Sequence, residues 1–514
     1  MPVADLILKN AKVVTMDAAP PTAELVAIAG DKIRLVANNE ELESVSGVNT
    51  RIIDCHGKTV VPGFNDAHCH IISFIRKLFS LDLSPSSVSS IADIKAAIRQ
   101  QAQNTPRGKW LLGTDFNEFY LAEKRLPTCW EIDEVAPHHP VVLSHRSLHA
   151  CVLNSLALSL AGITSETMDP SGGLIDRDPA TGEPNGVLFE MLGDIREKVI
   201  PLLSEGELTE GIALANQHYL SYGITSLQEA TVSNDYCRWQ TFQRFKETGK
   251  LQSRLSMMLG TEARRQFQEA GLASGAGGSQ LRLGGVKMIL SEVTGQLQPP
   301  QPELDLQALS CHRAGFQLAF HAIEENTVAA AIAALEYVSS HPPNGQRHRI
   351  EHCSECSPHL LERLGRLEAV VVTQPPFLYY SGERYLATVP VRQLPWLYRI
   401  KSLLNSGLIV AGSSDSPVVP SNPLVGIYAA VTRQAESGQQ LLPEECISAS
   451  QAIAMYTINA AYASGEEKMK GSITPGKLAD MVVLSSDPTD SPPEHVKDIK
   501  VEMTIIGGKV VWEA

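Results

Sequence analysis

Short apolar runs rich in β-branched residues recur along the middle of this 514-residue chain at a nearly constant interval. Their centres fall at Ile224, Leu255, Val286, Leu318 and Ile350, in steps of 31 or 32 residues. Helix-like segments such as TVAAAIAALEYVSS lie between them, so each unit reads as a strand followed by a helix. A (β/α)8 TIM barrel of about 250 residues divides into units of about 31 residues. The period therefore predicts an α/β barrel.

Three further runs complete the predicted barrel. VVPGFNDAH supplies the first strand, and EAVVVTQ around Val371 and GLIVAGS around Ile409 supply the seventh and eighth. The roughly 140 residues between strands one and two are too many for a βα connection, so they predict an inserted subdomain. An insertion at this point leaves the barrel at its carboxyl face, so we expect it to cover the substrate pocket.

The two ends of the chain have similar sequence patterns, both typical of β-strands. LILKNAKVVTMD at 6–17 and MTIIGGKVVWEA at 503–514 each contain a turn pair followed by Lys-Val-Val, which predicts a hairpin at each end. We therefore expect a small composite β-sandwich built from both termini. We expect the sandwich to comprise 1–61 and 471–514, the barrel to comprise 62–80 and 215–470, and the insertion to comprise 81–214.

Composition narrows the classes of partner. The formal net charge of −14 and the absence of a basic stripe argue against nucleic acid, and no apolar run is long enough to span a bilayer. The N-terminal residues lack a secretory signal, and nine scattered cysteines suit a reducing compartment, so we expect a cytoplasmic protein. Cys353 and Cys356 form a C-x-x-C that we interpret as two thiols at a helix start.

A pair of histidines, His68 and His70, ends the first predicted strand. Alternate side chains of a strand share a face, so this pair can direct two nitrogens at one metal ion. Candidate partners recur at the carboxyl ends of other predicted strands: Lys287, His321, His352 and Asp415. Barrel active sites lie at that face, so the sequence predicts a metal centre there.

Two of these side chains suggest hydrolytic chemistry. Lys287 lies in an apolar run, where a neutral amine could react with carbon dioxide to give a carbamate that bridges two metal ions. The alternative is a salt bridge to Glu229 or Glu292. Asp415 could cap a helix, but at the metal rim it would act as a general base that passes a proton from water to a leaving nitrogen.

These motifs together resemble the amidohydrolase superfamily of metal-dependent hydrolases. The matching segments are PGFNDAHCH, VKMIL, His321, RIEHC, GSSDSP and TINAAYASGEEKMKGSITPGKLADMVVL. DEVAPHHPVVLSHRSLHACVLNSLAL, DPSGGLIDRD and GEPNGVLFE in the insertion are most similar to the branch that contains N-substituted formamide deformylases. The resemblance implies a metal-dependent hydrolase of non-peptide C–N bonds, such as those of N-formyl or N-acyl amines.

The resemblance also implies roles for individual residues. A divalent metal, with zinc expected, would be held as one or two ions by His68, His70, His321, His352 and Asp415, with carboxylated Lys287 as the bridge in a two-ion centre. His149 would contact the substrate carbonyl or leaving group, and a structural histidine under the lid is the alternative. Apart from the resemblance, the side chains of Trp110, Phe116 and Tyr120 are of the type that lines an apolar or aromatic pocket, and the alternative is that they belong to the core. The substrate is a small molecule, and association into a homodimer stays open.

The chain departs from the branch at two places. After His321 it has Ala-Ile-Glu324-Glu325, where the branch usually has Ala-Ile-Gly-Asp. His-x-x-Glu is the pattern of mononuclear deaminases and chlorohydrolases of nitrogen heterocycles, so catalysis by Glu324 is a second hypothesis. Ser291 stands where the branch often has an acidic residue. A catalytically silent scaffold is a third hypothesis, which predicts lost ligands, whereas all five ligand positions are intact.

Overall fold

The structure is a computed structural model that describes residues 3–514 apart from 171 and 293–294. The chain divides into two compact units. The first comprises Met1–Ile71, Ile212–Leu290 and Gln301–Ala514, and the second comprises Ile72–Gly211 and Ser291–Pro300. The second unit thus includes a short segment after the fourth barrel strand, which no sequence signal indicated. The domain boundaries drawn from the sequence stay a prediction.

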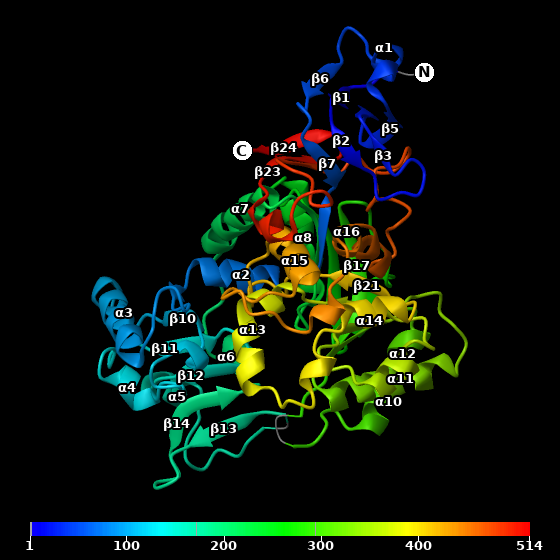
Figure 1. Cartoon of the computed structure of the whole chain (residues 1–514). Coiled ribbons are helices and arrows are strands. Elements are labelled where there is room, and N and C mark those ends of the chain that lie inside the picture. Colours follow the sequence, from blue (N-terminus) through cyan, green and yellow to red (C-terminus); the bar gives the residue numbers. More distant parts are fainter. Residues whose placement is uncertain (1–2, 171, 293–294) are drawn as a thin grey trace. The chain divides into compact units, whose positions relative to one another are not determined.

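A parallel eight-stranded barrel forms the centre of the first unit (Figure 1). Its strands follow the order β8 (Phe64–Cys69), β15 (Ile224–Glu229), β16 (Arg254–Gly260), β17 (Leu281–Ile289), β18 (Leu318–Ala322), β19 (Arg349–His352), β20 (Val370–Thr373) and β21 (Ile409–Gly412). Parallel strands buried on both faces need apolar side chains throughout, which explains the continuous apolar runs. The predicted (β/α)8 barrel is confirmed.

Two backbone hydrogen bonds close the barrel between its first and last strands. The amide of His70 donates to the Ser416 carbonyl over 2.7 Å, and the amide of Asp415 donates to the His68 carbonyl over 2.9 Å. The barrel is therefore closed at its carboxyl end by the same segments that hold the candidate metal ligands.

Helices follow the barrel strands as the repeat predicts. They include α8 (Tyr236–Glu247), α9 (Arg264–Glu269), α10 (Gln301–Arg313), α11 (Glu325–Ser339), α12 (Pro358–Leu364), α13 (Pro376–Thr388), α14 (Ile400–Asn405), α15 (Pro423–Thr432), α16 (Ala449–Met455) and α17 (Ile458–Ala463). In α11 the buried residues Val328, Ile332 and Leu335 recur at helical spacing and pack inward. No helix within the described residues is both long and apolar enough to cross a membrane.

Two sheets from the chain ends form a composite sandwich, seen in Figure 1 where blue and red strands lie together. One sheet has the order β5 (Lys32–Ala37), β4 (Leu25–Ala29), β1 (Leu6–Lys9) and β6 (Arg51–Asp54). The other has the order β24 (Lys509–Glu513), β23 (Val501–Ile506), β22 (Met481–Leu484), β7 (Thr59–Pro62), β2 (Lys12–Val14) and β3 (Thr22–Ala23). Leu8 and Ile28 of the first sheet share one core with Val60 and Met481 of the second.

The hairpin predicted at the C-terminus is present, but the one at the N-terminus is wrong. Strands β23 and β24 pair antiparallel around the Gly507-Gly508 turn. By contrast, β1 pairs with β4 and β6, whereas β2 pairs with β3 and β7 in the other sheet. Asn10 adopts a left-handed φ of 52°, and its side-chain amide donates to Asp54 over 2.7 Å. This corner redirects the chain between the sheets instead of folding it back.

The second unit contains a mixed six-stranded sheet. Its order is β13 (Leu174–Arg177), β14 (Pro184–Phe189), β12 (Ala150–Leu153), β11 (Val141–His145), β10 (Leu111–Phe116) and β9 (Leu81–Asp82). Its helix α3 (Ile91–Asn104) begins where Ser90 accepts a hydrogen bond from the Asp93 amide, and it buries Ile94 and Ile98. The inserted segment therefore has a core of its own.

Candidate metal centre

Four histidines and one aspartate meet at the carboxyl ends of the barrel strands. His68 lies in β8, His70 follows it, and His321 and His352 lie at the ends of β18 and β19. The His68 and His352 rings are 4.9 Å apart between centroids, and those of His321 and His352 are 4.5 Å apart. Asp415, three residues after β21, completes the group. The structure thus brings together all five ligands predicted from the sequence.

The distances around Asp415 suit ligands that share an ion. Its Oδ1 lies 3.0 Å from His70 Nε2 and 3.6 Å from His68 Nε2. One ligand atom from each of these three residues lies within 4.8 Å of the other two. Ligands about 2.0–2.2 Å from a zinc ion lie at comparable separations from one another.

The orphaned atoms at the centre fit a cation. His352 Nε2 is buried and has no hydrogen-bond partner among the described residues, and the buried Asp415 Oδ1 lies near the His70 and His68 ring nitrogens without meeting the geometry of a hydrogen bond. Buried polar atoms are costly without a partner, and both of these atoms have a lone pair to offer. Both residues also adopt left-handed φ angles, 71° for His352 and 56° for Asp415. Such strain in residues other than glycine clusters at functional sites. The donor set therefore fits a divalent metal.

Outer hydrogen bonds orient three of the rings. Nδ1 of His68 lies 2.5 Å from Glu351 Oε2, and Nδ1 of His352 lies 2.7 Å from Gln374 Oε1. Nδ1 of His70 lies 2.9 Å from the Thr231 hydroxyl. With Nδ1 engaged in each case, Nε2 is left to face a metal ion.

Sequence reasoning missed these outer partners. Glu351 is a buried charged residue of barrel strand β19, and Arg349 lies next to it on the same face. The two charges within the predicted strand HRIEH were the sequence feature that could have indicated these outer partners. Gln374 and Thr231 follow other strands, and no spacing in the sequence links them to the histidines.

Lys287 lies inside the barrel next to the ligand group. Its side chain is buried, and Nζ lies 3.2 Å from His68 Nε2. Burial lowers the pKa of Lys287 to about 8, against the opposing effect of the Glu351 and Asp415 carboxylates. The described residues show no ion pair from Lys287 to Glu229, whose carboxylate instead accepts from the Ile71 amide over 2.5 Å. An appreciable neutral fraction of the amine is therefore present near pH 8.

Asp66 forms hydrogen bonds between the two segments that carry His68 and Asp415. Its Oδ1 accepts from the amide of Ser414 over 3.0 Å, and its Oδ2 accepts from the Ser414 hydroxyl over 2.5 Å. Burial raises the pKa of Asp66 to about 6, although the Ser414 hydrogen bonds oppose the shift. Asp415 shows the opposite result: burial alone would raise its pKa, but His70, His68 and His352 hold that pKa below its usual range.

The remaining predicted residues have other surroundings. Glu324 is exposed just before α11, and its carboxylate accepts from the Thr327 hydroxyl over 3.4 Å. In the second unit, His149 Nδ1 lies 2.8 Å from Glu190 Oε1, and Phe116 is fully buried in a hydrophobic core. Trp110 packs partly buried on a second core of that unit, and the Tyr120 ring packs edge-on to Phe119. Substrate contact by these residues stays a prediction.

A parallel α/β barrel with four histidines and an aspartate at its carboxyl face is the architecture of a metal-dependent hydrolase. The chain belongs to the amidohydrolase family, whose model matches residues 51–512. It is therefore a hydrolase of carbon–nitrogen bonds.

Similar proteins include the N-substituted formamide deformylase of Arthrobacter pascens, 28% identical over 99% of this chain and 98% of that protein. The Protein LONG AFTER FAR-RED 3 of Arabidopsis thaliana is 31% identical over 99% of this chain and 92% of its own length. An uncharacterized metal-dependent hydrolase from Pyrococcus horikoshii has the same fold, with a TM-score of 0.76 at 22% identity over 95% of this chain and 99% of that one.

Proposed function

We propose that this protein hydrolyses the amide bond of an N-formyl or N-acyl amine. The observation that supports this most is Lys287, a buried amine 3.2 Å from a candidate metal ligand. An amine that loses a proton can attack carbon dioxide through its nitrogen lone pair, forming a carbamate and releasing a second proton. A carbamate at this position would add a carboxylate-like ligand and allow a second ion, which favours amide hydrolysis over mononuclear deamination. The similarity to a formamide deformylase points in the same direction.

The proposed ligands are His68, His70, His321, His352 and Asp415, with zinc as the expected ion. A divalent ion held there would polarise the amide carbonyl and lower the pKa of the attacking water. Asp415 is the proposed proton shuttle. Its pKa is held below the usual range, so it is a carboxylate at neutral pH and can accept the proton from the attacking water. The same proton then passes to the leaving nitrogen, which departs as the free amine.

The second candidate is deamination of a nitrogen heterocycle with help from Glu324. The exposed Glu324 carboxylate, three residues after His321, keeps this candidate open. The two reactions differ in product, because amide hydrolysis releases an amine and a carboxylate, whereas deamination releases ammonia.

A substrate screen with two variants tests the proposal. Zinc-loaded protein is supplied with N-formyl amines, N-acyl amines and aminopyrimidines, and released amine and ammonia are measured. We expect amine release that survives in Glu324→Gln and is lost in Asp415→Asn. Ammonia release that is abolished in Glu324→Gln would overturn the proposal in favour of deamination, and turnover of none of these substrates would also count against it.

The lysine part of the proposal is tested separately by native mass spectrometry of the metal-loaded protein. Lys287→Met should lose the mass of one carbon dioxide together with one metal ion, whereas Glu324→Gln should retain both. A single ion on a bare lysine in the unmodified chain would contradict the two-ion centre.

A further inference from the structure

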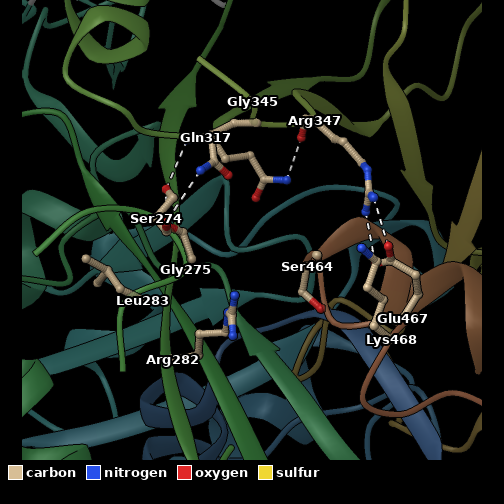
Figure 2. A pocket seen from close by; sticks show the side chains of 13 residues that line it. Ser274, Gly275, Arg282, Leu283, Gln317, Gly345, Arg347, Ser464, Glu467 and Lys468 are labelled. Atoms are coloured by element: carbon tan, nitrogen blue, oxygen red, sulfur yellow. Dashed lines mark hydrogen bonds and ion pairs between the residues drawn. The ribbon is translucent and has the colours of Figure 1, made fainter. Parts of the chain in front are cut away.

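A cavity of about 270 Å³ lies in the first unit at the amino ends of three barrel strands (Figure 2). Arg282 and Leu283 come from the start of β17, Gln317 directly precedes β18, and Arg347 precedes β19. Lys287 lies five residues beyond Arg282 on the same strand, which corresponds to about 16 Å at 3.3 Å per residue. The cavity is therefore at the opposite end of the barrel from the candidate metal centre.

The cavity has more positive than negative charge. Arg282, Arg347 and Lys468 line it together with one acid, Glu467. Arg347 donates to both Glu467 oxygens, over 3.0 and 2.8 Å, and lies over the Tyr462 ring, so these two charges neutralise each other. No ion pair joins Arg282 or Lys468 to a carboxylate within the described residues. Two positive charges thus remain in a chain whose formal net charge is −14.

The guanidinium of Arg282, which lines this cavity, is incompletely paired. Its Nε is buried and has no hydrogen-bond partner within the part of the chain that the structure describes. Figure 2 shows dashed lines at Arg347 and Gln317, whereas none reaches Arg282. A guanidinium that the protein leaves without a counter-charge is costly, and an oxyanion in the cavity is the ligand that best pairs with it.

Glycines keep the guanidinium accessible. A Cβ on Gly275 would lie 3.1 Å from Arg282 Nη2, so a side chain there would crowd the guanidinium. Gly277 has a φ of 105°, and a Cβ there would lie 2.4 Å from the Leu281 carbonyl oxygen, so this turn requires glycine. The loop thus brings bare backbone close to the arginine and leaves the space open.

The lining also offers an acceptor for the rest of a ligand. Gln317 Nε2 donates to the carbonyls of Arg347 and Ala463, over 2.5 and 2.8 Å, and its Oε1 has no hydrogen-bond donor among the residues that the structure describes. Such an oxygen accepts from a hydroxyl or an amine. The volume lies just below the range of about 300–1,000 Å³ typical of pockets for drug-sized ligands, so the ligand must be small.

We propose that this cavity is a second binding site, which takes a small organic anion through its phosphate or carboxylate group. Arg282 and Lys468 supply the charge, and Gln317 contacts a polar group on the ligand body. The site does not depend on which reaction the metal centre performs, because it lies at the other end of the strands.

Calorimetric titration of the metal-loaded full chain tests the proposal, with inorganic phosphate and succinate as probes at constant ionic strength. We expect saturable binding of one anion per chain, weakened tenfold or more in Arg282→Gln. Arg265→Gln is the matched control, since Arg265 is an exposed arginine paired with Glu269 on α9, and it should bind as the unmodified chain does. Saturation by phosphate alone would identify a phosphate ester as the ligand class, and saturation by succinate alone a carboxylate.

Two results would overturn the proposal. One is that neither phosphate nor succinate binds saturably. The other is that Arg282→Gln binds the anion with the same affinity as the unmodified chain, which would show that the anion binds elsewhere, for example at the metal centre. Should Arg282→Gln fail to fold, the exposed Lys468 provides a second variant, Lys468→Gln, in which we expect weaker binding. Unchanged affinity in that variant would also count against the site.

Discussion

The hydrogen bond from His352 to Gln374 determines which ring nitrogen of His352 can bind a metal ion. Gln374 Nε2 donates to the Ser413 hydroxyl over 2.9 Å, and that hydroxyl donates to the Thr373 carbonyl over 3.1 Å. The chain of donors leaves Gln374 Oε1 as an acceptor toward His352 Nδ1, 2.7 Å away. Nδ1 therefore carries the proton, and the buried Nε2 presents its lone pair to the centre.

Gln374→Leu removes this acceptor without disturbing the bond from Ser413 to Thr373. The His352 N–H then lacks a partner in a buried setting, which costs about 1–3 kcal/mol, and the ring can move its proton to Nε2, where it blocks the metal. Loss of an outer partner of a metal-binding histidine typically weakens metal affinity by about 10–100-fold, equivalent to about 1.4–2.7 kcal/mol. We expect zinc affinity to fall within that range.

Competition with a chelator of known zinc affinity measures the effect. The matched control is Gln374→Glu, which keeps an acceptor at the same position and should bind zinc at least as tightly as the unmodified chain. Thermal unfolding of the metal-free variants checks that both fold. If Gln374→Leu binds zinc within about twofold of the unmodified chain, a difference of about 0.4 kcal/mol, then this hydrogen bond does not control the ring.

Three further predictions concern stability. Removal of metal by a chelator should lower the melting temperature, because an ion present at about 100 times its dissociation constant stabilises the folded chain by about 2.7 kcal/mol. Asp480→Asn should cost about 3–5 kcal/mol in urea unfolding, since it leaves the buried Arg254, now bonded to Asp480 over 2.6 and 2.9 Å, without a counter-charge. Burial lowers the pKa of His348 to about 4 in the folded chain, where its Nδ1 accepts a hydrogen bond from the Leu318 amide. The same imidazole in the unfolded chain has a pKa of about 6.5. Between about pH 6.5 and 4 the unfolded chain therefore binds a proton on His348 that the folded chain does not. Stability should therefore fall as pH falls through that window, by at most about 2 kcal/mol between pH 7 and 5, and His348→Gln should remove this slope from the pH dependence of urea unfolding.

The barrel could be predicted because its signal is both local and repeated. Strands such as β20 and β21 are buried on both faces, so they appear as continuous apolar runs, and each run is followed by a helix within one unit of the repeat. The fold then places the ends of all strands at one face, which is why residues as distant as His68 and Asp415 could be assigned to one centre.

Strand pairing over long distances could not be predicted in the same way. The Asn-Ala pair at residues 10–11 resembles a hairpin turn, but β2 pairs with β7, and β7 pairs in turn with β22 near the other end of the chain. A local turn signal fixes only where the chain bends. Which sheet receives each strand depends on apolar surfaces that come together only in the folded sandwich.

Charged residues in the barrel strands were the signal for the outer hydrogen bonds of the metal centre. Arg349 and Glu351 alternate along β19, so both point to one face of a strand buried on all sides, and neither charge is stable there alone. Arg349 contacts both oxygens of Glu351 and supplies the opposite charge that the buried pair needs. Glu351 in turn accepts at His68 Nδ1 and leaves Nε2 for the metal. The paired charges of β19 therefore orient a ligand that ends another strand, even though the sequence does not show which ligand they orient.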